Sequence, residues 1–377
     1  MAKRKKIRTE FRKGHQSRQR KTDITREVAM GDGVEDRLLS SERVSGKGEL
    51  TRHRTIVGDW DEEQSGGMSV LRDVDQREHL RGRVLSVHGL TSRVLSDADG
   101  REYQCATRRV LKNLSTDQRH VVAAGDIVYF RPEGDDHGFI ERIEPRFSSL
   151  CRTSKGRQHV LVANVDQVLI VSSASEPTLK PNLIDRVIVE GERMHIRPIV
   201  CINKIDLVDP ADLQPLAGVY GQMGYEVLLV SARLGIGVER LRSRVAGKAT
   251  VVAGQSGVGK SSLLNTIDTG LELRVGAVST ENQKGKHTTT AARLIPLSQG
   301  GFVVDTPGIR QFQLWDVIPE EVAGYYRDLR PFINLCKYQD CTHSHEDSCG
   351  VKDAVADGKL DARRYESFCH LCEGDEL

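Results

Sequence analysis

The feature that most constrains this chain is a glycine-rich segment, residues 254–261, with the sequence Gly-Gln-Ser-Gly-Val-Gly-Lys-Ser. An apolar stretch at 250–253 precedes it, and a helix-forming stretch at 262–265 follows it. A strand, a glycine-rich turn and a helix in this order are typical of a phosphate-binding loop, because glycines let successive backbone N–H groups point at an anion. The segment therefore predicts an α/β domain with a site for nucleotide phosphates, and the alternative is an ordinary glycine-rich turn.

Two side chains of this segment have a predicted task at the phosphates. Lys260 supplies a positive charge to the β- and γ-phosphates and so takes part in catalysis, and the Ser261 hydroxyl ligates Mg²⁺. The residues that we expect to contact the nucleotide here are Gly254, Ser256, Gly257, Val258, Gly259, Lys260, Ser261 and Ser262.

A second motif, Asp305-Thr306-Pro307-Gly308, follows an apolar stretch at 302–304. Asp305, at the end of a buried strand, can hold Mg²⁺ through a water molecule, and the Gly308 N–H can donate to the γ-phosphate. An Asp-x-x-Gly tetrapeptide is common by itself, but this one lies 45 residues after Lys260 and follows a strand. It therefore strengthens the prediction of a nucleoside triphosphate site.

A third motif, Asn203-Lys204-Ile205-Asp206, follows the apolar stretch 198–202 and predicts the base. The Asp206 carboxylate can accept two hydrogen bonds from the N1–H and N2–H₂ edge of guanine, which adenine lacks. Asn203 is expected to tie loops together, and the Lys204 stem is expected to lie on the base. The pair Ser231-Ala232 follows another apolar stretch, and its Ala232 N–H is expected to meet guanine O6. These residues predict GTP rather than ATP.

The order of the motifs is unusual, because the base motifs precede the phosphate loop, whereas in familiar small GTPases they follow it. The same sheet can be assembled in either order if the old chain ends lie close enough to be joined. Apolar runs that alternate with helical segments predict a parallel sheet covered by helices; the runs are 167–172, 197–202, 226–230, 250–253 and 302–304. In this order the nucleotide-sensing segments lead directly into the C-terminal part, so nucleotide state can be relayed there.

A cysteine-rich cluster lies in that C-terminal part. Three thiols and one imidazole in a short segment suit tetrahedral Zn²⁺, and four protein ligands make the site structural; they are Cys336, Cys341, His343 and Cys349. His345 is the alternative to His343, and we expect Cys369 and Cys372 to be free thiols. Clustered cysteines in a chain without an export signal favour metal binding over disulfides.

The N-terminal part is basic. Ten Lys or Arg residues and one acid occupy residues 1–21, although the net charge of the whole chain is only +2. Such an arm attracts phosphate polyanions by releasing their counterions, and the alternative is a solubilising tail. Beyond it, short β-rich stretches separated by turns predict a small oligonucleotide-binding (OB)-like barrel of about five strands that binds nucleic acid. An SH3-like barrel or an inert β-domain has the same pattern.

We therefore expect four regions: a basic, largely disordered or extended segment at 1–78, an OB-like barrel at 79–152, a permuted GTPase domain at 153–325, and a zinc-binding domain with an acidic tail at 326–377. No apolar run approaches the roughly 20 residues that a membrane helix needs, and no apolar signal core follows the basic start. We expect a cytoplasmic monomer that does not bind membranes.

The motif order, the segment Gly285-Lys286-His287-Thr288-Thr289-Thr290, the Asp305 motif and the Cys/His spacing together resemble one family over about residues 80–370. It is the family of circularly permuted GTPases that depend on the small ribosomal subunit and act late in 30S assembly. The resemblance implies that the barrel and the zinc domain bind 16S rRNA near the decoding region. It also implies that hydrolysis of GTP to GDP, stimulated by the subunit, releases the protein.

Catalysis needs a threonine that bonds Mg²⁺ and covers the γ-phosphate, and a group that orients water. Thr288, Thr289 and Thr290 all qualify for the first task, and we choose Thr289. Many GTPases carry Gln directly after the Asp-x-x-Gly motif, but Ile309 stands there and cannot hydrogen-bond water. Slow unaided turnover should follow. The resemblance implies that His287 is catalytic, and the alternative is a surface-loop histidine.

Two other functions fit parts of the pattern. A GTP-binding RNA scaffold would bind nucleotide without ribosome-stimulated turnover. An ATP-dependent kinase or nucleic-acid enzyme could use the same phosphate loop, but Asp206 and Ala232 argue against it.

Overall fold

The structure is a computed structural model, and it describes residues 6–10, 53–61, 69–72, 78–107, 122–154, 157–273, 292–305 and 319–373. The chain forms two compact units. The first comprises residues 1–146 with 156–160, and the second comprises 147–155 with 161–377. Within the described ranges, no helix has the length and apolar character needed to cross a membrane.

Three strands of the first unit lie in the region that we predicted to be largely disordered or extended. They are β1 (Lys6–Glu10), β2 (His53–Asp61) and β3 (Ser69–Arg72), and they pair antiparallel in the order β1-β2-β3. The stretches between them lie outside the described residues, so the predicted interaction of the basic arm stays a prediction.

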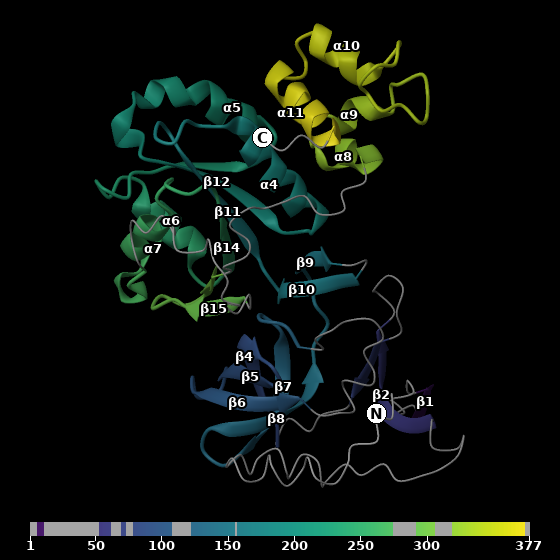
Figure 1. The fold of residues 1–377 in the computed structure, drawn as a ribbon, viewed down its shortest axis with the longest axis vertical. Coiled ribbons are helices and arrows are strands. Elements are labelled where there is room, and N and C mark those ends of the chain that lie inside the picture. The colour runs from purple at the N-terminus through teal and green to yellow at the C-terminus, as the bar shows by residue number, and fades with distance from the viewer. Residues whose placement is uncertain are drawn as a thin grey trace, which may run out of the picture. The chain divides into compact units, whose positions relative to one another are not determined.

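The rest of the first unit is a closed five-stranded barrel (Figure 1). Its strands are β4 (Leu80–His88), β5 (Thr91–Ser96), β6 (Glu102–Thr107), β7 (Ile127–Glu133) and β8 (His137–Ile143). They pair in the order β4-β5-β6-β8-β7, and β4 also pairs with β7, which closes the barrel. Alternate residues such as Val94 and Phe130 point into a core that is shielded from water. The predicted OB-like barrel is confirmed.

The second unit is built on a parallel sheet. After the two-stranded pair β9 (Ser149–Ser154) and β10 (Arg157–Ala163), six strands follow: β11 (Gln167–Ser173), β12 (Arg197–Asn203), β13 (Glu226–Leu229), β14 (Ala249–Ala253), β15 (Arg293–Pro296) and β16 (Phe302–Asp305). Their order is β13-β12-β11-β14-β16-β15, and only β15 runs antiparallel to its neighbour. The apolar runs of the sequence thus become buried strands, as predicted.

Helices cover both faces of this sheet (Figure 1). The helices α4 (Pro181–Arg193) and α5 (Gln214–Gln222) connect strands that step from β11 outward to β13. The helices α6 (Val238–Val245) and α7 (Lys260–Ile267) follow β13 and β14, where the chain crosses the sheet in the opposite direction. They pack on the face lined by Leu169 and Val171. Right-handed crossovers place helices on opposite faces when the direction of travel reverses. Short 3₁₀ turns, η2 (Ile205–Leu207), η3 (Pro210–Leu213) and η4 (Thr269–Leu271), complete the connections.

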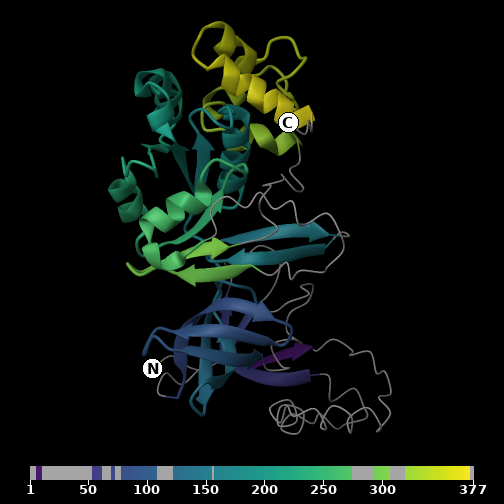
Figure 2. The same ribbon diagram turned by 60° about the vertical axis from the view of Figure 1, so that its left-hand side comes forward.

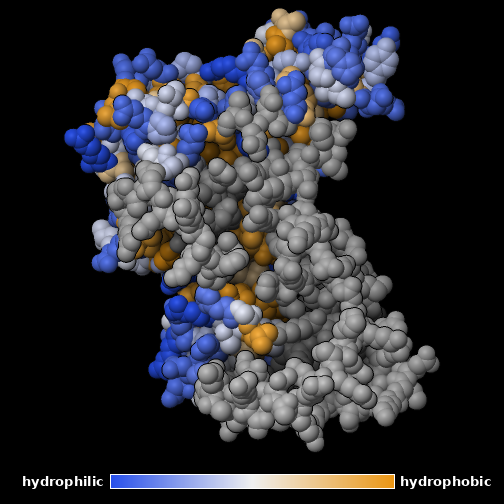
Figure 3. Space-filling model, viewed as in Figure 1, coloured by the Kyte–Doolittle hydropathy of each residue, from blue (hydrophilic) through white to orange (hydrophobic). Residues whose placement is uncertain are grey.

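The C-terminal helices form a separate apolar cluster within the same unit (Figure 2). They are α8 (Pro319–Tyr325), α9 (Arg330–Ile333), α10 (Gly350–Ala356) and α11 (Ala362–Glu373). Phe368 of α11 packs edge-on against Tyr326, with ring centroids 5.8 Å apart, and Val189 of α4 joins the same cluster. Their outer surface in Figure 3 is largely hydrophilic. Helix α4 is therefore covered by the sheet on one side and by α8 and α11 on the other.

A buried ion network joins the C-terminal helices to α4. Arg364 of α11 forms an ion pair with Asp185 of α4 at 2.5 Å and a two-bond contact with Asp328 at 2.9 and 3.0 Å. Tyr220 of α5 donates a hydrogen bond to Asp185 at 2.7 Å. Burial raises the pKa of Asp185, and Arg364 opposes that rise. Because a buried charge is expensive without its partner, this network fixes the C-terminal helices on the α/β domain.

Candidate nucleotide site and metal centre

The predicted nucleotide motifs meet at one edge of the parallel sheet. The carboxyl ends of β11, β12, β13, β14 and β16 share this edge because these strands are parallel. The direction of travel reverses between β11 and β14, and open α/β sheets bind ligands outside the carboxyl ends at such a reversal. The phosphate loop follows β14, the base motif follows β12, and Asp305 ends β16.

Two glycines of the phosphate loop are required by close backbone approach. Gly254 has φ 143°, and a Cβ there would lie 2.1 Å from the Val171 carbonyl oxygen of β11. Gly259 has φ 92°, and a Cβ there would lie 2.5 Å from Asn203 Nδ2. Any larger residue would push the loop away from its neighbours. The glycine pattern therefore holds the phosphate loop against both β11 and the base motif.

Lys260 begins α7 and lies back over the phosphate loop. Its Nζ donates to the carbonyl oxygens of Gly254 and Gln255, both at 2.6 Å. Ser256 and Gly257 are exposed at the tip of the loop, and Val258 is buried beneath it. The half-buried Ser261 and Ser262 follow Lys260 in the first turn of α7.

Asn203 links the phosphate loop to the second base motif, as its predicted tying role requires. Its side chain is buried, its Nδ2 donates to the Val258 carbonyl at 2.9 Å, and its Oδ1 accepts from the Ala232 N–H at 3.1 Å. The Ala232 N–H, which we expected to face guanine O6, is therefore bonded to Asn203 in the structure. The predicted contact of Ala232 with guanine stays a prediction.

The other two residues of the base motif are also oriented by neighbours. The Ser231 hydroxyl donates to Asp206 Oδ1 at 2.6 Å, which fixes the carboxylate. Lys204 adopts the left-handed conformation with φ 63°, and its Nζ donates to the Glu176 carbonyl at 2.5 Å. The segment 173–177 was not among the predicted site residues, and its Ser173 hydroxyl also donates to the Glu176 carbonyl. The sequence does carry a signal for this segment, because the polar pair Ser172-Ser173 ends the apolar run of β11, just as polar residues follow the apolar runs at the other motifs.

Several predicted residues lie outside the described residues. These are His287, Thr288, Thr289, Thr290, Gly308 and Ile309. The structure places the backbone of Asp305 at the end of β16, next to the strand that carries the phosphate loop. The choice of catalytic and Mg²⁺-binding residues among them therefore stays a prediction.

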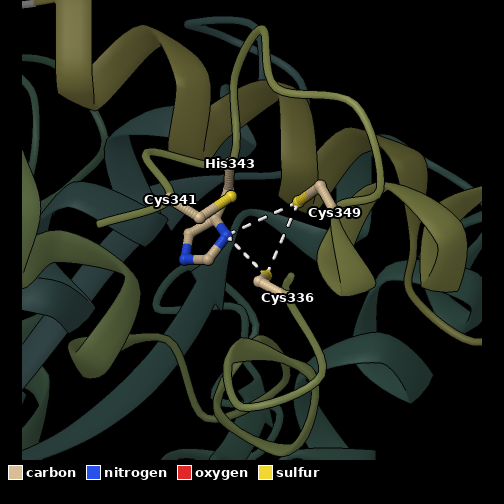
Figure 4. Close-up of side chains that lie close together, drawn as sticks. All are labelled: Cys336, Cys341, His343 and Cys349. Carbon is tan, nitrogen blue, oxygen red and sulfur yellow. Dashed lines mark hydrogen bonds between the residues drawn. The ribbon is translucent and has the colours of Figure 1, made fainter. Parts of the chain in front are cut away.

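The predicted metal ligands converge in the C-terminal helices (Figure 4). One ligand atom from each of Cys336, Cys341, His343 and Cys349 lies within 4.8 Å of the other three. The Sγ atoms of Cys336 and Cys349 are 3.9 Å apart, and His343 Nδ1 lies 3.3 and 3.5 Å from them. Tetrahedral zinc with ordinary bond lengths would require about 3.8 Å between sulfurs and about 3.6 Å between sulfur and nitrogen. The donor set and its spacing fit zinc.

The surrounding structure holds these ligands in place. His343 is buried with φ 61°, its carbonyl accepts a hydrogen bond from the Tyr365 hydroxyl at 2.8 Å, and burial lowers the pKa of its imidazole. Glu346 accepts from the Thr342 N–H at 2.7 Å and so closes the loop between ligands. His343 belongs to the converging group, whereas the side chain of His345 is 80% exposed and lies outside it. Cys369 and Cys372 are not part of the ligand group.

Comparisons with known proteins identify the family. A model of the RsgA GTPase family matches residues 143–315. The small ribosomal subunit biogenesis GTPase RsgA of Sodalis glossinidius is 38% identical over 297 residues, which cover 77% of this chain and 84% of that protein. The chain belongs to the RsgA GTPase family. The RsgA of Yersinia enterocolitica is also 38% identical, over 81% of this chain and 88% of its own length.

Solved structures of RsgA-like proteins show the same architecture. YjeQ from Thermotoga maritima is 35% identical with a TM-score of 0.65, over 78% of this chain and 98% of that protein. YloQ, a circularly permuted GTPase, is 30% identical with a TM-score of 0.62, over 80% and 97%. The permuted order read from the sequence is confirmed. Membership of the RsgA family makes the chain a GTP hydrolase, and such enzymes use GTP, GDP and Mg²⁺.

Proposed function

We propose that this GTPase binds the small ribosomal subunit and its 16S rRNA and acts in late 30S assembly. The subunit stimulates hydrolysis, and hydrolysis is coupled to release. The observation that carries the proposal is the 38% identity to a small ribosomal subunit biogenesis GTPase across most of both chains. The barrel adds a nucleic-acid-binding fold, and the basic arm adds charge that favours RNA. We propose that the protein works as a cytoplasmic monomer.

At the base, the proposal assigns guanine selection to Asp206. The Ser231 hydroxyl and the loop that contains η2 orient its carboxylate toward the edge of the sheet. A carboxylate held this way would lose a partner with adenine and reject it by several kcal/mol, on the order of 2–4. Asn203 joins the base loops to the phosphate loop, so base recognition and phosphate position are mechanically linked. Lys204 extends over Gly259 and supports the base from one side.

At the phosphates, Lys260 must exchange its two carbonyl partners for phosphate oxygens when nucleotide binds. We assign the phosphate cradle to the backbone of Gly254–Ser262, Mg²⁺ ligation to Ser261 and Thr289, and the γ-phosphate contact to Gly308. His287 orients the attacking water, and Ile309 cannot. A site that positions phosphate and base well but holds water poorly binds tightly and turns over slowly until a partner completes it.

In the C-terminal helices, we assign one structural Zn²⁺ to Cys336, Cys341, His343 and Cys349. The four protein ligands leave no open position, so the residues act by holding the fold and not by chemistry. They join the loop before α10 to the end of α9, and Phe368 packs between His343 and Tyr326.

Co-sedimentation with purified 30S subunits tests the proposal. Affinity should be higher with a non-hydrolysable GTP analogue than with GDP, because hydrolysis can drive release only if the two states bind differently. Mature 50S subunits serve as the control and should not bind in either state. Equal affinity for 30S in both nucleotide states would overturn the coupling of hydrolysis to release and leave a GTP-binding RNA scaffold as the better description.

A further inference from the structure

A cluster of arginines lies at the edge of the sheet opposite the nucleotide motifs. Glu226 is the first residue of β13, the outermost strand of the sheet, and its side chain is 11% exposed. Three guanidinium groups converge on its carboxylate. Arg244 Nε lies 2.8 Å and Arg240 Nη2 3.2 Å from Oε1, and Arg197 Nη2 lies 3.3 Å from Oε2. This set is called the Glu226 cluster below.

The Glu226 cluster carries more positive charge than its own carboxylate can neutralise. Three guanidinium groups, which stay protonated at any physiological pH, surround one carboxylate. Their side chains are 64%, 62% and 45% exposed for Arg197, Arg240 and Arg244. Each guanidinium has five N–H donors and places one on Glu226 among the described contacts. The exposed side chains leave guanidinium surface open to a ligand.

Secondary structure fixes the positions of these donors. Arg197 begins β12, whereas Arg240 and Arg244 are one turn apart on α6, so two elements present their guanidinium groups to one point. Two like charges one turn apart on a helix repel each other, which makes the arrangement unfavourable unless an anion offsets it. Burial favours the neutral form of Glu226, but the hydrogen bonds from Arg244 and Arg240 outweigh burial and lower its pKa. The carboxylate therefore stays ionised and holds all three side chains.

The neighbouring groups on this edge extend the same charge pattern. Lys248 is exposed just before β14. The acids nearby are engaged: Asp166 accepts the Ala249 N–H at 2.7 Å, and Glu192 forms an ion pair with Arg327 at 2.7 Å. Among the described residues of this domain, the exposed large apolar ones are Leu207, Leu234 and Ile236, which follow the carboxyl ends of β12 and β13 and so belong to the other edge. A charged edge without an apolar centre suits a polyanion better than a protein partner.

We propose that the Glu226 cluster is an RNA-binding site of the GTPase domain that holds phosphodiester groups of structured RNA. Arginine forks match phosphate oxygens with two parallel hydrogen bonds, and Glu226 pre-orders the forks before RNA arrives. On the proposed function, the RNA is that of the small ribosomal subunit. The site lies at the amino ends of the strands, away from the nucleotide motifs, so its contribution to affinity is the same in the GTP and GDP states.

Charge reversal tests the site. The double variant Arg240→Glu/Arg244→Glu should bind 30S subunits at least about ten-fold more weakly in both nucleotide states, and the slope of log affinity against log salt should fall by about two. GTP affinity and unstimulated turnover should not change. The control is Lys180→Glu/Arg293→Glu, which reverses two exposed charges of the same domain outside the Glu226 cluster. It should weaken binding less than three-fold.

A second variant separates RNA binding from a structural role. Glu226→Gln removes the only carboxylate that the three arginines share among the described residues. If the cluster only protects the edge strand, this change alters stability and leaves 30S affinity as it was. Glu226→Gln loses the pre-ordering of the forks but gains one unit of net positive charge, and at low salt the charge should outweigh the ordering. The proposal therefore expects 30S binding that is about two- to five-fold tighter at low salt, even if the melting temperature falls.

Each outcome decides between explanations. Equal losses in the double variant and its control would show a general charge effect and overturn the site. A loss of affinity with an unchanged salt slope would indicate a protein contact and would also overturn it. If the wild-type protein does not bind 30S at all, the proposed function fails, and the same variants with a structured RNA hairpin still test the cluster by itself.

Discussion

The nucleotide edge and the metal cluster place polar groups in different ways. The nucleotide edge collects loops from strands spread over residues 173–305, and these loops stand on a large buried sheet. Its polar side chains have partners within the loops: Asn203 and Lys260 donate to backbone carbonyls, and Ser231 donates to a carboxylate. The metal cluster takes four side chains from residues 336–349 among short helices with a small core. The comparison indicates that the first site has internal partners for its polar groups, whereas the second, on the proposed function, depends on a zinc ion.

Metal removal should give the largest difference between the two regions. Cys349→Ser removes a buried ligand, and the C-terminal helices should lose stability by several kcal/mol, on the order of 5, because the ion holds a core too small to fold alone. Hydrogen exchange should show loss of protection in α9 to α11 while the sheet stays protected. Metal analysis should find about one zinc per wild-type chain.

The control for this variant is Cys372→Ser, which changes a thiol outside the ligand group. It should keep the zinc and its protection pattern. If zinc-free wild-type protein kept slow hydrogen exchange in α9 to α11, the claim that the metal cluster depends on zinc would be wrong.

The ion network between the two regions should give the next largest effect. Arg364→Met leaves Asp185 buried next to Tyr220 without its positive partner, and stability should fall by about 3–5 kcal/mol. The double variant Asp185→Asn/Arg364→Met removes both charges and should recover more than half of that loss. Denaturant unfolding measures both. Arg363→Met, at the exposed neighbouring position, should change stability by less than about 0.5 kcal/mol.

A change in base selection should affect ligand binding without affecting the fold. Asp206→Asn should weaken GTP binding by about two orders of magnitude and favour xanthosine triphosphate, whose C2 oxygen prefers a donor. Zinc content and the melting temperature should stay native, because Asp206 is only half-buried. Fluorescent nucleotide titration measures the affinities, and Asp212→Asn in the exposed turn nearby is the control. Native GTP affinity in Asp206→Asn would remove this residue from the base site.

The sequence predicts most of the nucleotide edge because each motif carries a local signal. Backbone geometry requires glycine at 254 and 259, and Asn203 ends an apolar strand. Because each motif follows a strand of the parallel sheet, the sequence predicts that they meet at one edge. The Cys/His spacing predicts the metal cluster for the same reason. The Arg364–Asp185 pair has no such signal, since its partners lie 179 residues apart and each looks like an ordinary helix-surface charge. The bond from the Ala232 N–H to Asn203 has no sequence signal either, because it depends on loop geometry.

Acid should have the smallest effect on the sheet. The pKa of Glu226 is lowered in the folded state, so its contribution to stability is present above pH 4.5 and is lost as pH falls below that value. Because water reaches the three arginines, the contribution should be small, about 0.5 kcal/mol. Wild type and Glu226→Gln should therefore differ in melting temperature at pH 7 and converge toward pH 3.5. If the difference in melting temperature stayed the same from pH 7 to pH 3.5, the variant would act through something other than the charge of the Glu226 carboxylate.

Steady-state GTP hydrolysis with and without 30S subunits is the most direct test of a ribosome-dependent GTPase. The Ile309 position predicts slow turnover of the protein alone, and saturating 30S subunits should raise the rate at least about ten-fold while 50S subunits do not. An equal rate with and without 30S, for protein that binds GTP and carries its zinc, would contradict the account.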